Sequence, residues 1–127
     1  MPMNKEHKEF HAIDMANGWS TPDGYPEGIQ HKILAGRLDE QSKTGNRTRL
    51  LRFARGAFTS VPFVHDYWEE VIVLDGDLIV EGKDRQSFGP LTYACRPPGI
   101  SHGPFSSRSG CLLFEIHYYD DRWDAEK

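Results

Sequence analysis

From residue 31 onward the chain is a series of short apolar runs, each bounded by residues that favour turns. The runs cover 31–38, 47–58, 69–74, 77–82, 91–96 and 111–119, and the breaks include KTGN at 43–46, GKD, FGP, RPPG and SSRSG. Runs of this length are typical of β-strands. Short strands spaced roughly ten residues apart are typical of a β-sandwich or β-barrel. We therefore predict an all-β fold.

Two local features refine this prediction. Asp75-Gly76 stands between two apolar runs, and this dipeptide favours a tight hairpin over 73–80. Residues 7–15 are compatible with a short helix, although the pattern is weak.

Residues 1–30 differ from the rest because they are polar and rich in turn signals, as in NGWSTPDGYPEG at 17–28. We expect an ordered arm there, since Trp19 and Tyr25 would be costly to leave exposed. The expected organisation is an N-terminal arm at 1–30, a β-barrel at 31–119 and a charged tail at 120–127.

Composition narrows the class of protein. The 127 residues correspond to one domain. A net charge of −4 argues against nucleic acids and anionic membranes as partners. No apolar stretch approaches the roughly 20 residues that span a bilayer, and the N-terminus lacks the apolar core of a signal peptide, so we expect a cytoplasmic protein. The two cysteines, Cys95 and Cys111, are predicted to be small buried apolar residues.

Chemistry-bearing residues gather in two segments. The first, VPFVHDYWEEVIVLDGDL at 61–78, places His65, Glu69 and Glu70 directly before an apolar run. This cluster is either a solvated strand end or part of a site. The second, RPPGISHG at 96–103, places His102 after a Pro-Pro-Gly corner that restricts the backbone. The histidines at 7, 11 and 31 are predicted to lie on the surface or to cap turns.

Together these segments resemble the two sequence motifs of the cupin superfamily. The first motif has His-x-His, three or four residues, Glu, six residues and Gly; the second has Pro-x-Gly, two residues and His. The matching residues here are His65, Glu69, Gly76, Pro97, Gly99 and His102. The resemblance covers roughly residues 45–118. This part of the chain is similar to the RmlC-like cupin domains of anti-sigma factors and small diketone-cleaving dioxygenases. It implies a double-stranded β-helix, the cupin jelly roll.

The sequence departs from the family pattern at three positions. Phe63 stands where the first histidine of His-x-His is expected, Leu91 stands where the family has a glycine, and Ser106 stands at an asparagine-like position. The change at 91 affects only a turn, and Gly89 lies two residues earlier. The change at 63 removes a predicted metal ligand.

The resemblance implies a divalent metal site. Its expected ligands are His65, Glu69 and His102, a set that suits iron, zinc, manganese or nickel. The alternative is a cupin that has lost its metal and keeps these residues as polar pocket lining. Positions 63, 65 and 69 share strand parity, whereas Glu70 is expected to point outward unless a bulge at Tyr67-Trp68 reverses the faces.

The last run, CLLFEIHYY at 111–119, alternates between two faces. One face carries Glu115 and His117, and the other is apolar. If the first face lines the barrel, Glu115 becomes a candidate catalytic residue and His117 a candidate additional metal ligand. If the apolar face lines it, both residues lie outside.

Arginines and aromatic residues supply further candidates. Arg49, Arg52 and Arg55 lie on or near one strand, and an inward arginine would bind a substrate carboxylate, whereas outward ones would form surface salt bridges. We include Arg52 and Arg96 as catalytic candidates. The candidate pocket residues are Phe63, Tyr67, Tyr93 and Phe105; their alternative roles are core or dimer contacts.

Three functions are compatible with these features. The first is a metal-dependent, dioxygenase-like enzyme acting on a small carbonyl or phenolic compound, with isomerase or lyase chemistry as the close alternative. The second is a non-catalytic module that binds a small ligand or a metal. The third is metal-free catalysis with His65 or His102 as general base. By resemblance we also expect a homodimer, with residues 17–28 as its contact.

Overall fold

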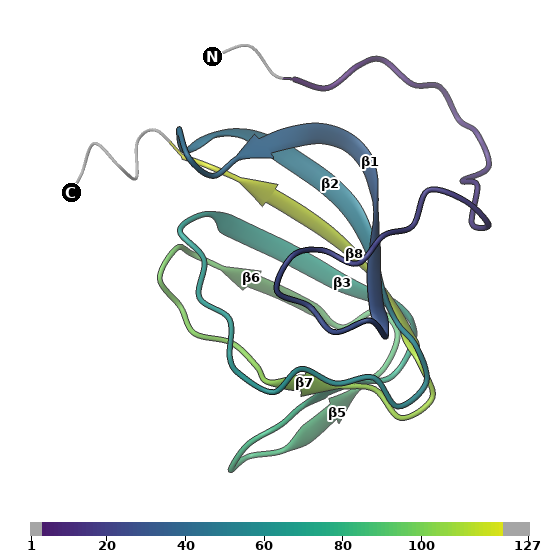
Figure 1. Ribbon diagram of the computed structural model, residues 1–127, viewed down its shortest axis with the longest axis vertical. Helices are drawn as coiled ribbons and strands as arrows, with labels where there is room; N and C mark the ends of the chain where they lie inside the picture. Colours follow the sequence, from purple (N-terminus) through teal and green to yellow (C-terminus); the bar gives the residue numbers. More distant parts are fainter. Residues whose placement is uncertain (1–3, 121–127) are drawn as a thin grey trace.

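The computed structural model describes residues 4–120 and contains eight strands and no helix over that range (Figure 1). The strands are β1 (Ile29–Asp39), β2 (Thr44–Phe53), β3 (Trp68–Gly76), β4 (Leu78–Val80), β5 (Gln86–Phe88), β6 (Tyr93–Arg96), β7 (Phe105–Ser106) and β8 (Cys111–Tyr118). The predicted all-β fold is confirmed, whereas the short helix predicted at 7–15 is wrong because that segment has no regular structure.

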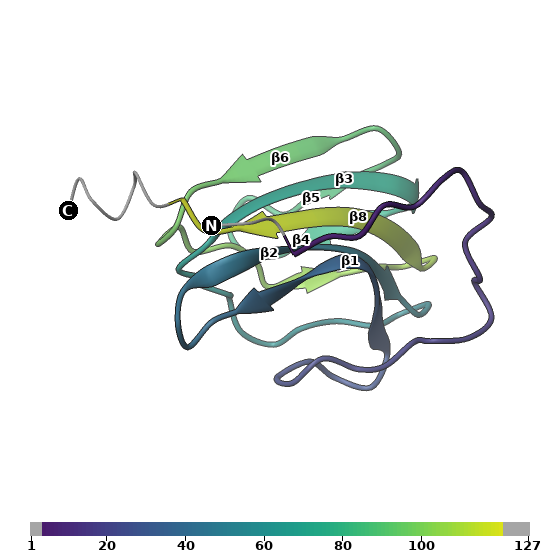
Figure 2. The same cartoon turned by 90° about the horizontal axis from the view of Figure 1, so that it is seen from above.

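The strands form two antiparallel sheets. The larger has the order β1-β2-β8-β3-β6, and the smaller has the order β5-β4-β7. Figure 1 shows the larger sheet curving over one end of the molecule, with β5 and β7 at the other, and Figure 2 shows the same sheets from above. This arrangement is the predicted jelly roll.

Asp75-Gly76 makes a corner between the sheets, so the hairpin predicted over 73–80 is wrong. β3 pairs with β6 and β8 in the larger sheet, and β4 begins two residues later in the smaller one. Gly76 has φ of 80°, and a Cβ at this position would lie 2.0 Å from the carbonyl oxygen of Gly110. A glycine is therefore needed for this close crossing.

Alternation along β8 separates a buried face from a partly exposed one. Cys111, Leu113, Glu115 and His117 are buried, and the residues between them are only partly so. At one end of this face, Leu113 and Cys111 join the apolar core, which also contains Ile29, Leu51, Phe53, Val71, Val73, Leu78 and Phe105. At the other end the buried residues are polar. Cys111 is buried as predicted, whereas the prediction for Cys95 is wrong because it is exposed on β6.

Residues 17–19 of the arm before β1 contact the outer side of β1 and β2. Asn17 accepts a hydrogen bond from Lys32 at 2.7 Å, and Trp19 stacks under Arg52 at 3.8 Å. The division into an arm, a barrel and a tail stays a prediction, as does the role of the arm in a homodimer. The predicted tail at 120–127 lies outside the described residues except for Asp120. Within residues 4–120 no helix is long and apolar enough to cross a membrane.

Candidate metal centre

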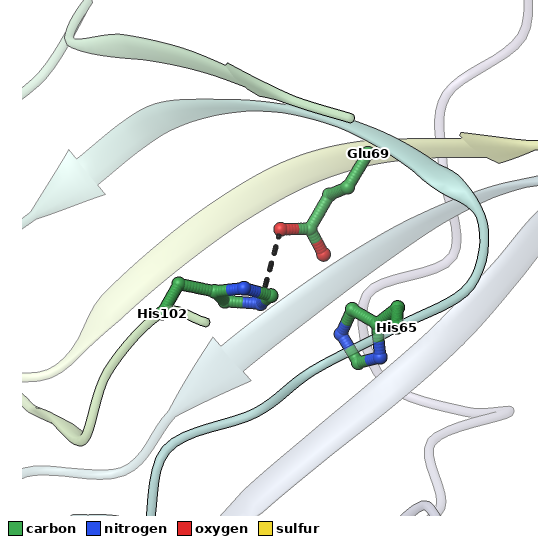
Figure 3. A group of neighbouring side chains, drawn as sticks. All are labelled: His65, Glu69 and His102. Atoms are coloured by element: carbon green, nitrogen blue, oxygen red, sulfur yellow. Dashed lines mark ion pairs between the residues drawn. The ribbon is translucent and has the colours of Figure 1, made fainter. Parts of the chain in front are cut away.

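Three side chains converge at the polar end of the barrel: His65 from the segment before β3, Glu69 from β3 and His102 from the segment before β7 (Figure 3). Each offers a ligand atom within 4.8 Å of the others. Two backbone hydrogen bonds between Phe63 and His102, of 2.7 and 2.9 Å, hold the two segments together. The structure thus brings together the three residues that the motifs predicted.

The two histidines present neutral rings to this centre. Nδ1 of His102 lies 3.2 Å from the carbonyl oxygen of Ile100, which can only accept, so Nδ1 donates and the lone pair of Nε2 faces Glu69. Burial lowers the pKa of His65 to about 4 and also lowers the pKa of His102. Both rings are therefore uncharged at pH 7, which is the state in which imidazole binds a metal.

Glu69 is buried, and each of its carboxylate oxygens accepts a hydrogen bond. Oε2 accepts one from Nη1 of Arg96 at 2.9 Å, and Oε1 accepts one from Nε2 of His117 at 3.0 Å. Burial and the charge of Glu115 would raise the pKa of Glu69, but the hydrogen bond from His117 and the electrostatic effects of His117 and His102 outweigh them and hold this pKa below its ordinary value. Glu69 is therefore a carboxylate. Its neighbour Glu70 points outward as predicted.

Arg47 determines which nitrogen of His117 carries the proton. Its guanidinium lies 3.1 and 2.8 Å from Nδ1 through two nitrogens, and a guanidinium can only donate. Nδ1 is therefore an acceptor, and the proton on Nε2 is donated toward Glu69. Glu69, Glu115 and His117 also have ligand atoms within 4.8 Å of one another. Metal ligation by His117 stays a prediction. Ligation through Nε2 would move the ring proton to Nδ1, and Arg47 would then have to release its hydrogen bonds to Nδ1.

A buried ion pair lies beside this centre. Arg49 contacts Glu115 through two nitrogens, each 2.8 Å from Oε1, and their side chains are 3% and 7% exposed. Arg49 also donates to Nδ1 of His31 at 3.0 Å and to the hydroxyl of Tyr25 at 3.3 Å. Burial opposes the ionised form of Glu115, but Arg49 and His117 reverse this and hold its pKa far below the ordinary value. The polar face of β8 therefore lines the barrel.

The other arginines divide between the two faces. Arg52 points outward, where it bonds Gln30 at 2.8 Å, so its prediction as a catalytic residue is wrong. Arg96 reaches Glu69 and borders the interior cavity. His31 was expected at the surface, but it is half-buried against Arg49, and burial followed by the charge of Arg49 lowers its pKa to about 4.

Two cavities meet at the centre. A small interior cavity of about 30 Å³ borders Glu69 and His102, and a cleft of about 520 Å³ opens past His65. Phe63 lines both cavities and stacks on Tyr25 at 4.9 Å between ring centroids. This arrangement places the aromatic ring at the boundary between the interior and the cleft.

The other predicted pocket residues are placed as follows. Phe105 lines the interior cavity, and Tyr67 lines the cleft, with its ring 4.5 Å from that of His65. Tyr93 is 58% exposed and donates to Glu70, so the prediction that it lines the pocket is wrong. Tyr93 is one of the two exposed positions of β6, and the short run at 91–96 did not define which face would point inward.

Residues 14–119 match the sequence family described as the ChrR cupin-like domain. The chain belongs to this cupin family. A search of curated proteins found no match.

Solved structures with the same fold include three differently named proteins. An RmlC-like cupin from Shewanella frigidimarina NCIMB 400 is 15% identical, with a TM-score of 0.66 over 96% of this chain and 99% of that one. KdgF from Halomonas sp. is 21% identical, with a TM-score of 0.64 over 88% and 96%. An acetylacetone dioxygenase from Acinetobacter johnsonii is 16% identical, with a TM-score of 0.63 over 96% and 86%. At these identities the likeness concerns the fold.

The residues of this cupin fit a divalent ion. Two uncharged imidazoles and one carboxylate form the set that suits iron, zinc, manganese or nickel. The ring of His65 has stacking contacts but no hydrogen bond to any other described residue, so its nitrogens are available as ligands. Arg96 orients Glu69 from the side, as partners outside the ligand set commonly do.

Arg47 was missed in the sequence, although a signal for it was present. It lies two residues before Arg49 on the same face of a strand that must bury that face. Two arginines on the inward face of a core strand require buried acceptors, and β8 supplies these at the paired positions, His117 and Glu115.

The buried ion pair generates a stability prediction. Replacing Glu115 alone by leucine leaves Arg49 buried without its partner and should cost about 3–5 kcal/mol of unfolding free energy. The double variant Arg49→Met/Glu115→Leu should recover most of this loss, because no buried charge is left unpaired. Urea unfolding monitored by fluorescence measures both values.

The exposed pair Arg85–Glu81 is the control, and Arg85→Met should change the unfolding free energy by less than about 1 kcal/mol. Equal destabilisation by the single and double variants at 115 would contradict the assigned role of the ion pair.

Proposed function

We propose that this cupin is a metal-dependent enzyme acting on a small carbonyl or phenolic compound, with dioxygenase-like chemistry as the first candidate. The observation that carries the proposal is the convergence of His65, Glu69 and His102 beside an open cleft. Three protein ligands leave coordination positions for a substrate, and such an ion supplies Lewis acidity or, as iron, a site for dioxygen.

The surrounding residues support this role by holding the ligands in place. His117 and Arg96 fix the two oxygens of Glu69, and the carbonyl oxygen of Ile100 fixes the ring of His102. Side chains fixed in this way need little rearrangement when an ion or substrate binds, which favours both affinity and rate.

The cleft is suited to a small molecule. Its volume of about 520 Å³ is within the range of ligand pockets, and Phe63, Tyr25 and Tyr67 give it aromatic walls. Phe63 and Phe105 add aromatic surface to the inner side of the centre, where they line the small cavity. The shared fold with an acetylacetone dioxygenase is consistent with this reaction, but a fold does not determine a reaction.

Metal analysis is the first test. Protein purified without chelator should contain stoichiometric metal, and His102→Ala should weaken metal affinity by at least about tenfold because one of three ligands is lost. His11→Ala removes an exposed histidine and is the matched control, with no expected change. Absence of metal from the unmodified protein, or equal metal content in both variants, would refute the assignment.

Oxygen uptake is the second test. Iron-loaded protein should consume oxygen with at least one member of a panel of small β-diketones and phenols, and His102→Ala should abolish this uptake. If metal is bound but no oxygen is consumed, the dioxygenase branch is wrong. Conversion of the same carbonyl compounds without oxygen uptake would instead indicate isomerase or lyase chemistry.

A further inference from the structure

The cleft beside His65 contains a positive charge without a counter-ion among the described residues. Both hydrogen bonds of Arg47 go to Nδ1 of His117, an uncharged acceptor, and Arg47 forms no ion pair with a described carboxylate. The neighbouring arginines differ, since Arg49 is paired with Glu115 and Arg96 with Glu69. One positive charge therefore remains at the base of the cleft.

A hydroxyl without a hydrogen-bond partner accompanies this charge. Tyr67 is 4% exposed and lines the cleft, yet its hydroxyl forms no hydrogen bond to any other described residue. The guanidinium carbon of Arg47 lies 6.0 Å from the centre of the Tyr67 ring. The hydroxyl is therefore free to donate to a ligand in the cleft, and a half-buried cation without an anion is costly.

The other charged groups of the cleft leave this site open to an anion. Asp23 and Glu40 also line the cleft, but both are exposed to solvent, which screens them from Arg47. Neither forms an ion pair with Arg47. An anion from solution could therefore contact both Arg47 and Tyr67 without displacing a carboxylate of the protein.

We propose that the cleft binds the carboxylate of a small organic acid, with Arg47 pairing with the carboxylate and Tyr67 donating a hydrogen bond to it. The planar guanidinium suits a carboxylate. The aromatic walls suit an apolar body on the same molecule. Because the Tyr67 ring stacks on His65 at 4.5 Å, an acid bound there lies beside the candidate metal centre.

This inference names the substrate class of the proposed enzyme as a small carboxylic acid with a carbonyl or phenolic group. It rests on the proposed function only for the claim that the acid is converted. The binding claim itself depends on Arg47 and Tyr67 and needs no ion.

Paired probes test the binding claim. Chelator-treated protein is titrated with benzoate, benzamide, phenylacetate and phenylacetamide, and binding is followed by amide chemical shifts. Each acid should bind about tenfold or more tightly than its amide, since a charged carboxylate forms stronger hydrogen bonds to a guanidinium than a neutral amide does. The shifts should be largest for residues of the cleft.

Single substitutions test whether Arg47 and Tyr67 cause the preference for the acid over the amide. Arg47→Gln should bring the acid-to-amide affinity ratio close to one, whereas a merely structural defect would weaken acid and amide equally. Tyr67→Phe keeps the ring and should weaken acid binding several-fold. Arg37→Gln removes an exposed arginine on β1 and should change nothing.

Equal affinity for acid and amide in the unmodified protein, absence of acid binding, or an unchanged ratio in Arg47→Gln would overturn the proposal. If Arg47→Gln does not fold, an undiminished acid affinity in Tyr67→Phe overturns the assigned contacts. Acid preference in a protein that binds no metal would refute the proposed metal chemistry alone, and metal binding without acid preference would refute this inference alone.

Discussion

The buried carboxylate of Glu69 is the group on which the interior of this cupin depends. It is 4% exposed, and removing such a charge from water is costly unless its oxygens find partners. Those partners come from two parts of the chain, Arg96 at the end of β6 and His117 on β8, while the unprotonated Nε2 of His102 lies 3.5 Å from the same carboxylate. The two sequence motifs and the last strand are therefore oriented around one side chain.

The same requirement extends outward through the polar end of the barrel. His117 can donate to Glu69 only because Arg47 occupies its other nitrogen, and Arg49 neutralises Glu115 beside it. These contacts pair the Glu115 carboxylate with Arg49, so Glu69 is the carboxylate that groups with His65 and His102. The result is a rigid set of donors for an ion, next to a cleft whose charge favours an anionic ligand.

Much of this arrangement was predictable from the sequence, and the failures have physical causes. The long runs identified the main strands, and motif spacing identified the three converging residues. Asp75-Gly76 predicts a turn, but it does not say whether the next strand returns to the same sheet, and here the chain crosses to the other. Tyr93 was misplaced because a short strand does not define its own inward face. Arg47 was missed because its function depends on β8, a partner distant in sequence.

The most direct measurement is a crystal structure of the metal-loaded protein with anomalous diffraction data collected on both sides of the metal absorption edge. We predict one strong anomalous peak within bonding distance of His65, Glu69 and His102, with His117 still hydrogen-bonded to Arg47. A peak among Glu69, Glu115 and His117, or peaks only at the protein surface, would contradict it.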